Sequence, residues 1–462
     1  MTISVLLVGL LEGIFLLYLI ALSLFLGVSA FLVLHQQARR TPEDWRPVYQ
    51  ESWPPITLLV PAYREEKTIV HSLESMLCLD YPHLELVVVC DGSPDNTLGV
   101  LQTHFDLQIE APFPAQANLT TQPVETSYRS RRFSNLRVLW KRNGGKADSL
   151  NAALRIAETP LVCAMDADTL IAPDGLRKLA EPFLRQPDLL AAGGTVYPAN
   201  GLTLGDFELT RWGMPVSRWA RFQAIEYVRA FLLGRFGWNQ FGTVLIISGA
   251  FGLFRREEVV ACGGWDTRTV GEDFELVLRL LEQNGRRVCH VPEAACWTEV
   301  PETRAMLKSQ WIRWHRGLIE SLHMHPELFR HPDSMVRMLG WYFRLFEEYA
   351  PWVESAGFIL TLIMAFSFDG LYWRYAALFT LSNYIGLVIF SLLAVLLDFR
   401  YPESVVRHWS WLHILGTILV EPIGYQPFTL VWRIIGTYRH WRGVRAHWEA
   451  QTRHGFRSID KG

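Results

Sequence analysis

An apolar run near the start of the chain constrains the fold more than any other feature. Residues 5–34 contain a single charged residue, Glu12. A helix of about 20 apolar residues crosses a bilayer, so this run is long enough to be a membrane span. A cleaved signal peptide is the alternative, but the run is too long and lacks both a basic start and a cleavage-site pattern. The arginines that follow place the next segment in the cytoplasm by the positive-inside rule: Arg39, Arg40 and Arg46.

Apolar segments return after residue 350. Residues 352–368 carry only Glu354, and residues 375–397 carry no charge, so both are predicted spans. Residues 405–421 and 428–438 follow, separated by a break at residues 421–424. We interpret them as a tight pair of spans, which gives five spans in all and leaves the basic tail in the cytoplasm. A re-entrant hairpin would satisfy the same parity.

The residues between these segments have the composition of a soluble domain. Half of the 462 residues are hydrophobic and only 19% are charged, which membrane spans account for. The formal net charge of −2 argues against nucleic acid as a partner. The six cysteines form no CxxC pair, so neither a zinc site nor a disulfide framework is expected.

Short apolar runs in this domain are typical of buried strands. Residues 56–60, 84–90 and 161–165 are such runs, and residues 67–78 between the first two have helical spacing. Strands that alternate with helices predict a doubly wound, mostly parallel sheet. Such sheets bind ligands at the carboxyl ends of their strands. Residues 107–135 are rich in Pro, Gln, Ser and Thr and are predicted to form a long surface loop.

Carboxylates follow two of the predicted strands. Asp166 and Asp168 stand two residues apart after the strand at 161–165, a spacing that suits a hard divalent cation holding a diphosphate. Asp91 ends the strand at 84–90 and suits recognition of a nucleotide base or ribose, with Glu65 bordering the same crevice. Alone, each is more often a solvated turn or an Asx-turn. The apolar strands before them favour the functional interpretation.

Three further motifs lie at the starts of helices or on their faces. Lys146 follows two glycines and could bind phosphate, although a plain Gly-Gly turn is the simpler interpretation. Asp273 is a candidate general base, or one of the acidic residues that a helix N-terminus favours. Gln310, Arg313 and Trp314 share a helix face, as an interfacial Trp/Arg helix also would.

In order, these motifs resemble the processive family-2 glycosyltransferases, which include cellulose, hyaluronan, chitin and poly-N-acetylglucosamine synthases. The resemblance runs from about Pro54 to Gly317. Its most specific element is the Q-x-x-R-W motif at residues 310–314. The other elements are Pro61-Ala62-Tyr63-Arg64-Glu65, Asp91-Gly92-Ser93, Gly145-Lys146-Ala147, Asp166-Ala167-Asp168 and Gly271-Glu272-Asp273. No F-x-V-T-x-K gating motif and no PilZ-like domain is evident, so regulation by cyclic-di-GMP within this chain is not supported.

The resemblance implies a Rossmann-like GT-A fold and an inverting hexosyltransferase that requires Mg²⁺ or Mn²⁺. Asp273 would be the base, and Asp166 and Asp168 would hold the metal. Residues implied to bind the donor, a UDP-sugar, are Pro61, Tyr63, Glu65, Asp91, Lys146, Asp166 and Arg313. Residues implied to bind the glycan acceptor are Gly249, Glu272, Gln310 and Trp314.

We therefore predict an enzyme that polymerises sugar from a UDP-sugar into an extracellular polysaccharide and exports it through its own helices. The alternative is a non-processive glycolipid-forming glycosyltransferase similar to ceramide glucosyltransferase, and a transporter is a remote third class. We expect a multi-pass protein of the inner cell membrane with a cytoplasmic catalytic domain, and an accessory export protein is an open question. The predicted parts are an N-terminal span at 1–36, the catalytic domain at 37–320, interface helices at 321–350, membrane helices at 351–440 and a basic tail at 441–462.

Overall fold

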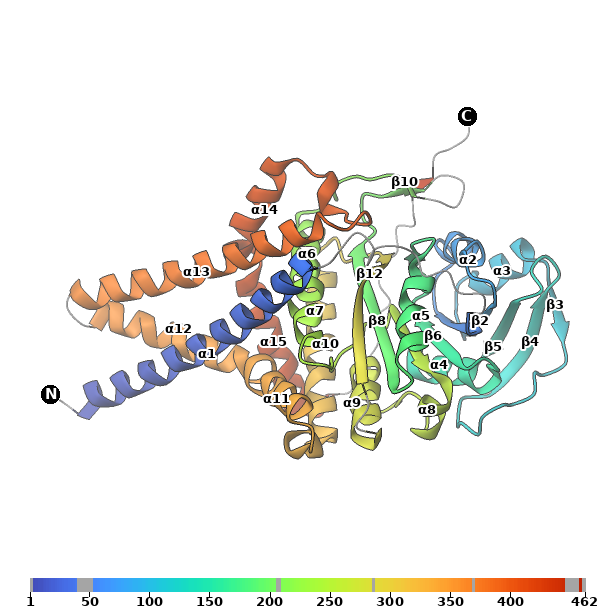
Figure 1. Cartoon of the computed structure of the whole chain (residues 1–462), viewed down its shortest axis with the longest axis horizontal. Helices are drawn as coiled ribbons and strands as arrows, with labels where there is room; N and C mark the ends of the chain where they lie inside the picture. Colours follow the sequence, from blue (N-terminus) through green and yellow to red (C-terminus); the bar gives the residue numbers. More distant parts are fainter. Residues whose placement is uncertain are drawn as a thin grey trace.

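The computed structural model describes residues 3–39, 53–204, 209–284, 287–367, 370–444 and 457–458. Figure 1 shows a sheet domain from which long helices extend to one side, with the N-terminus at the far end of these helices. Arg40, Arg46 and most of the predicted tail lie outside the described residues.

A ten-stranded sheet forms the core of the catalytic domain, in the order β3-β4-β5-β2-β1-β6-β11-β8-β12-β7. Its four central strands pair in parallel: β5 (Leu136–Lys141), β2 (Leu84–Asp91), β1 (Ile56–Ala62) and β6 (Leu161–Met165). The next strand, β11 (Phe251–Arg255), is antiparallel to both of its neighbours. The remaining strands are β3 (Leu107–Glu110), β4 (Val124–Ser130), β7 (Leu170–Ile171), β8 (Leu189–Pro198) and β12 (Arg287–Thr298).

The two innermost strands, β1 and β6, are almost entirely apolar because helices cover both faces of the sheet. In β1, Leu58 and Val60 belong to one core cluster, whereas Leu59 belongs to another. Successive side chains of a strand point to opposite faces, so this division separates the two layers. The first cluster includes residues of α2 (Ile69–Leu77), α3 (Thr97–His104) and α5 (Gly175–Arg185), and the second includes residues of α4 (Lys146–Ile156) and α9 (Glu272–Asn284). The predicted doubly wound fold is confirmed, with antiparallel additions at its edges.

The prediction of a long loop at residues 107–135 is wrong. The segment contains β3 and β4, which pair antiparallel with each other, and β4 pairs with β5. In β4, Ser127, Tyr128 and Ser130 are buried, and Tyr128 packs into the core. Polar residues dominate these strands because they lie at the sheet edge, where one face meets solvent, and this concealed the strand pattern. Within 107–135, the connection at residues 111–123 and the turn at residues 131–135 are irregular.

Long apolar helices form the second part of the molecule. By length and composition, two described segments can cross a membrane: Gly9–Arg39 within α1 (Ile3–Arg39) and Ala376–Asp398 within α13 (Gly370–Asp398). The helix α12 (Ala350–Ser367) contains a shorter apolar stretch. In Figure 1 these three helices extend together away from the sheet. They confirm a helical membrane region, while the count of five spans remains a prediction.

The last two helices form a bent pair. α14 (Trp411–Gly424) and α15 (Gln426–Trp441) change direction by 44°, which fits either one broken span or a re-entrant hairpin. The break was predicted at residues 421–424, but the helix continues through Pro422 and ends at Gly424. Proline lacks an N–H, so it removes one hydrogen bond of the helix without always ending it.

Shorter elements connect the two parts. Between the sheet and the long helices lie α6 (Arg218–Val228), the π-helix η2 (Arg229–Arg235), α7 (Phe236–Asn239) and α10 (Arg304–Met324). The region predicted as interface helices contains η3 (Pro326–Arg330), α11 (Ser334–Phe343) and η4 (Arg344–Glu348). The other elements are α8 (Arg256–Ala261), η5 (Val406–His408), and a small sheet of β9 (Thr203–Leu204), β10 (Leu209–Arg211) and β13 (Arg457–Ser458).

Candidate active site

One cavity of about 1220 Å³ lies between the carboxyl ends of the central strands and the long helices. Every residue that the sequence predicted for the site lines this cavity: Pro61, Tyr63, Glu65, Asp91, Lys146, Asp166, Asp168, Gly249, Glu272, Asp273, Gln310, Arg313 and Trp314. These residues come from distant parts of the chain. The carboxyl ends of the parallel strands bring the turns after β1, β2 and β6 together at one edge of the sheet. The start of α9, one face of α10 and the segment before β11 complete the cavity.

The turns after β1 and β2 form one wall of the cavity. The backbone N–H of Arg64 donates to Ser93 Oγ at 2.7 Å, which joins the two turns. Arg64 has a φ of 61°, a backbone conformation that non-glycine residues rarely adopt. Glu65 is buried, and its carboxylate accepts a hydrogen bond from Thr68. Glu65 therefore stabilises the start of α2 and also borders the crevice.

Asp91 ends β2 and is almost fully buried. Its carboxylate accepts hydrogen bonds from the backbone N–H groups of Gly144 at 2.9 Å and Gly145 at 2.8 Å, and it pairs with Lys141. Gly145 has a φ of 89°, which glycine adopts without strain. The loop before α4 is thus held against the end of β2.

Asp166 and Asp168 follow β6, as the spacing predicted. Lys146 Nζ lies 2.5 Å from Asp166 Oδ1, so this carboxylate already faces a cation. Asp168 is fully buried and accepts a hydrogen bond from Thr298 at 3.2 Å. Carboxylate oxygens are suitable ligands for Mg²⁺ or Mn²⁺, so these two aspartates could hold such an ion.

Asp273 lies at the start of α9 and faces the loop before β11. Its Oδ2 accepts the backbone N–H of Gly249 at 3.0 Å, and its Oδ1 accepts the N–H of Phe274 at 2.8 Å. A Cβ at position 249 would lie 2.9 Å from Lys146 Nζ and 3.2 Å from Asp273 Oδ2. Glycine therefore permits Lys146 and Asp273 to approach the same backbone segment. Burial raises the pKa of the neighbouring Glu272 to about 7, although Lys146 opposes this shift.

The Q-x-x-R-W motif lies on α10, on the membrane side of the cavity. Gln310 is buried and accepts a hydrogen bond from Gln223 Nε2 at 2.8 Å. Trp314 is 37% exposed, and its ring lies 6.4 Å from that of Tyr227. An aromatic face with this exposure, beside a cavity, is suited to stacking against a sugar ring.

A polar network that the sequence did not predict connects α10 to the bent helix pair. Trp311 Nε1 donates to the hydroxyl of Tyr425 at 3.0 Å, and this hydroxyl donates to Glu226 at 2.6 Å. Arg229 binds both oxygens of Glu421, at 3.0 and 2.7 Å. The cavity continues past this network between the long helices, where Phe15, Thr361, Asn383, Leu387 and Leu430 line it.

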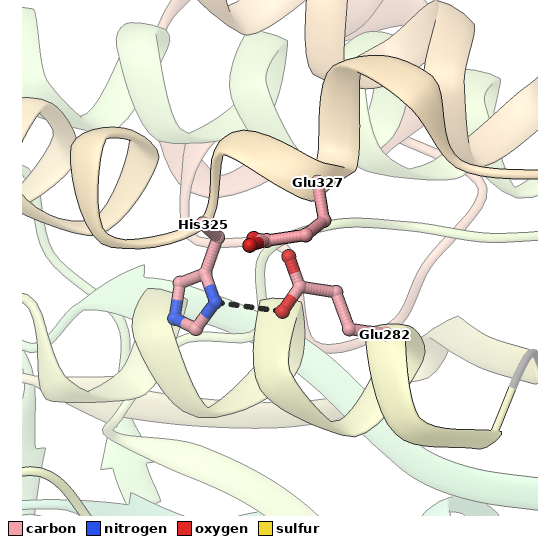
Figure 2. A group of neighbouring side chains, drawn as sticks. All are labelled: Glu282, His325 and Glu327. Atoms are coloured by element: carbon pink, nitrogen blue, oxygen red, sulfur yellow. Dashed lines mark hydrogen bonds and ion pairs between the residues drawn. The ribbon is translucent and has the colours of Figure 1, made fainter.

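Another cluster of titratable residues lies outside the cavity, at the far ends of α9 and α10. Ligand atoms of Glu282, His325 and Glu327 lie within 4.8 Å of one another (Figure 2). Both ring nitrogens of His325 are engaged, with Glu282 at 2.8 Å and with Glu275 at 3.0 Å. Burial alone would lower the pKa of His325, but the hydrogen bonds to Glu275 and Glu282 raise it to about 9. A protonated ring cannot bind a metal, so we interpret the cluster as a charged link between the two helices.

The fold and the arrangement of acidic residues at the strand ends define a GT-A-type glycosyltransferase domain joined to apolar helices. The chain belongs to a family described as Glycosyltransferase like family 2, which residues 54–317 match. It is therefore an enzyme of the hexosyltransferase type.

Relatives and solved structures agree with this assignment. The chain is 28% identical to poly-beta-1,6-N-acetyl-D-glucosamine synthase of Staphylococcus epidermidis over 390 residues, which cover 82% of this chain and 80% of that protein. It is 31% identical to the Staphylococcus aureus protein of the same name over 265 residues, 57% of this chain and 54% of that one. A mannosyltransferase from Pyrobaculum calidifontis, solved with GDP-mannose and Mn²⁺, shares the fold with a TM-score of 0.58 and 18% identity, over 94% of this chain and 100% of that chain.

Proposed function

We propose that this protein is a processive membrane glycosyltransferase that polymerises a sugar from a UDP-sugar donor and passes the product between its own helices. The first donor to consider is UDP-N-acetylglucosamine, because the relatives described above are named as synthases of a β-1,6-linked N-acetylglucosamine polymer. The catalytic domain would face the cytoplasm, where nucleotide sugars are available.

The continuity of the cavity is the observation that carries this proposal. The same cavity is lined by the strand-end carboxylates, such as Asp166, and by membrane-helix residues, such as Leu387. An enzyme that adds one sugar to a soluble acceptor has no need of a cavity that continues between apolar helices. Polar side chains within the helical part, including Thr361, Thr380 and Asn383, suit the hydroxyl groups of a glycan.

The proposed chemistry is one direct displacement with inversion at the anomeric carbon. Asp273 takes the proton from the acceptor hydroxyl. At the same time, the hydroxyl oxygen forms a bond to the anomeric carbon, and the bond from that carbon to the diphosphate breaks. A divalent cation on Asp166 and Asp168 would neutralise the diphosphate as it leaves. Arg313 adds a second positive charge on the other side of the cavity, and Lys146 is available for the same diphosphate.

Acceptor binding is assigned to the membrane side of the cavity. Trp314 would stack on the terminal sugar, and Gln310 and Glu272 would hydrogen-bond its hydroxyl groups. Gly249 leaves room for the acceptor beside Asp273, because a side chain at position 249 would project between Lys146 and Asp273. Pro61, Tyr63, Glu65 and the Asp91 turn would surround the nucleotide.

The test is turnover by the full-length protein in lipid vesicles with Mg²⁺ and radiolabelled UDP-sugars, followed by sizing of the product. We expect a long polymer from UDP-N-acetylglucosamine. A lipid carrying a single sugar would instead place the protein with the glycolipid-forming enzymes, and incorporation from another donor alone would correct the sugar. Vesicles of known sidedness, with donor added to one side, test the proposed orientation.

A further inference from the structure

Lys141 is a buried charge that the proposed chemistry does not use. It ends β5, and its side chain is 0% exposed. Its ammonium group pairs with Asp91, lies 2.7 Å from Asp148 Oδ1 and donates to the carbonyl oxygen of Arg142 at 2.8 Å. A lysine is rarely fully buried, because desolvation of its charge costs several kcal/mol unless it is paired. Burial of the Lys141 charge therefore requires partners of opposite charge, and the carboxylates of Asp91 and Asp148 are those partners.

The carboxylate of Asp91 is fully engaged on the inner side of the cavity wall. Besides Lys141, it accepts the N–H groups of Gly144 and Gly145 and the side-chain amide of Asn143 at 3.2 Å. A carboxylate offers about four lone-pair positions, so these four donors use its capacity. A Cβ at Gly92 would lie 2.8 Å from the backbone nitrogen of Asn143, so the turn and the loop are in close contact. Asp91 thus determines where the loop at residues 143–145 lies.

Asp148, the second partner of Lys141, attaches the irregular segment at residues 111–123 to the same place. It accepts the backbone N–H of Gln122 at 3.0 Å. The N–H of Arg142 donates to the carbonyl oxygen of Pro123 at 3.2 Å. Ala117 and Leu119 are buried in the core, which anchors the middle of the segment. Lys141 therefore connects this segment to the loop that borders the cavity.

The position of Lys141, Asp91 and Asp148 in the sheet indicates which part of the donor would lie beside them. Asp166, directly after β6, suits the diphosphate, and the side chain of Lys146 reaches it from the start of α4. The strand order β2-β1-β6 places Asp91 two strands away from Asp166, on the order of 10 Å at the usual strand spacing. That separation is comparable to the distance from the diphosphate to the base of a nucleotide. The loop at residues 143–145 accordingly borders the nucleoside.

We infer that Lys141 is a positioning residue for the nucleoside of the donor. With Asp91 and Asp148 it fixes the loop at residues 143–145, against which uridine binds. This inference rests on the proposed function, because it takes a nucleotide sugar as the donor. Without Lys141, two neighbouring carboxylates would be buried with no cation between them, and the loop would move away from β2.

The test compares Lys141→Met with Lys178→Met in the full-length protein. Lys178 is a matched control because it also lies between two carboxylates, Asp174 at 3.0 Å and Glu403 at 2.8 Å. Neither of these partners lines the cavity, whereas Asp91, the partner of Lys141, does. We expect Lys141→Met to weaken UDP binding and raise the donor KM about tenfold, the effect of losing one charge-assisted interaction, with a smaller change in kcat. Lys178→Met should leave both binding and KM unchanged.

Two further variants keep the inference testable if Lys141→Met does not fold. Asp148→Asn retains the Lys141–Asp91 pair and should weaken UDP binding only slightly. Combined with Lys141→Met, it removes one of the two uncompensated carboxylates and should restore part of the folding and of the UDP affinity. Normal UDP binding by Lys141→Met or by the double variant, or equal losses in Lys141→Met and Lys178→Met, would overturn the inference. If the wild-type protein binds no UDP, the proposed function itself fails.

Discussion

At the scale of single residues, each carboxylate in the cavity has a different partner, and the partner limits what the carboxylate can do. Asp91 receives four donors and orders a loop. Asp166 pairs with the ammonium group of Lys146. Asp273 accepts two backbone N–H groups, which fix its orientation without adding a positive charge. Of these three aspartates, only Asp273 combines a fixed position with a place beside the proposed acceptor, as a general base requires.

We therefore expect Asp273→Asn to reduce turnover by about 10²–10⁴-fold, the usual contribution of a general base, while UDP binding persists. The amide keeps the shape of the side chain but cannot take a proton. Radiolabelled sugar transfer measures the first effect, and calorimetry with UDP measures the second. Asp188→Asn is the control, because Asp188 is 56% exposed and does not line the cavity. Turnover close to that of the wild type would remove Asp273 as the base.

Chelation should abolish activity in the same assay. EDTA removes the cation proposed for Asp166 and Asp168, and without it the leaving diphosphate keeps its full negative charge. We expect Mg²⁺ or Mn²⁺ to restore transfer in the wild type. In Asp168→Asn much higher metal concentrations should be needed, because one charged ligand is lost. Metal-independent transfer would contradict the role of both aspartates.

The sequence could predict that Glu65, Asp91 and Asp166 lie close together because each follows an apolar parallel strand, and topology brings the ends of such strands together. Lys146, Asp273 and the Q-x-x-R-W motif lie at helix starts or within a helix, and the family resemblance connected them to the same cavity. The burial of Lys141 was not predictable. Charged residues interrupt the apolar ones in Leu-Arg-Val-Leu-Trp-Lys, a pattern typical of a strand at the sheet edge, where the lysine would be exposed to solvent. Its burial depends on Asp91, which lies 50 residues earlier, and on Asp148, whose position on the following helix periodicity does not relate to the end of β5. The same limit applies to Arg229, whose partner Glu421 lies 192 residues away.

At the scale of elements, two glycines allow the helix that carries Asp273 to approach the helix of the Q-x-x-R-W motif. A Cβ at Gly271 would lie 2.9 Å from the backbone of Gly317, and a Cβ at Gly317 would lie 2.8 Å from the backbone of Gly271. Both neighbours are main-chain atoms, which cannot rotate away. The distance between Asp273 and the Q-x-x-R-W motif therefore depends on the absence of side chains at Gly271 and Gly317. Periodicity alone did not reveal this contact, because Gly271 precedes α9 and Gly317 occupies an ordinary position within α10.

Gly317→Ala should accordingly push α9 and α10 apart. We expect a loss of about 1–3 kcal/mol in the stability of the domain, as overpacking usually causes, and a lower kcat. Thermal unfolding and sugar transfer measure the two effects. Gly416→Ala is the matched control, because Gly416 also lies within a helix and a Cβ there meets no atom within 4 Å. If both variants behave alike, the close crossing has no importance for activity.

His325 should make the link between the same two helices sensitive to pH. Its pKa is about 9 in the folded protein, above the value of about 6.5 expected after unfolding. The stabilisation, on the order of 3 kcal/mol at most, is therefore fully present below about pH 6.5 and is lost as the pH rises through about 9. We expect the melting temperature of the wild type to fall over this range and that of His325→Gln to change less. His83→Gln, at an exposed position, should follow the wild type.

At the scale of the whole molecule, the catalytic domain and the long helices share one cavity, through which the proposed movement of the product would be coupled to catalysis. Two groups of hydrogen bonds connect the catalytic domain to the bent helix pair. Trp311 and Glu226 both bind the hydroxyl of Tyr425, and Arg229 binds the carboxylate of Glu421. Both act at the bend between α14 and α15, which borders the cavity through Pro422 and Gln426. A displaced bend would alter the path of the product directly beyond Trp314.

Narrowing the helical part of the cavity should shorten the polymer without disabling the chemistry. Leu387 of α13 lines the cavity, whereas Ile389 on the same helix is 55% exposed and does not. We expect Leu387→Trp to obstruct the product, so that chains become shorter while the first sugar transfers and UDP binding continue. Ile389→Trp adds the same indole to a face that meets lipid and should leave chain length unchanged. Gel sizing of labelled product, with UDP release followed in parallel, separates obstruction from loss of catalysis. Equal chain lengths in the two variants would show that the product leaves by another path and would favour a glycolipid as the product.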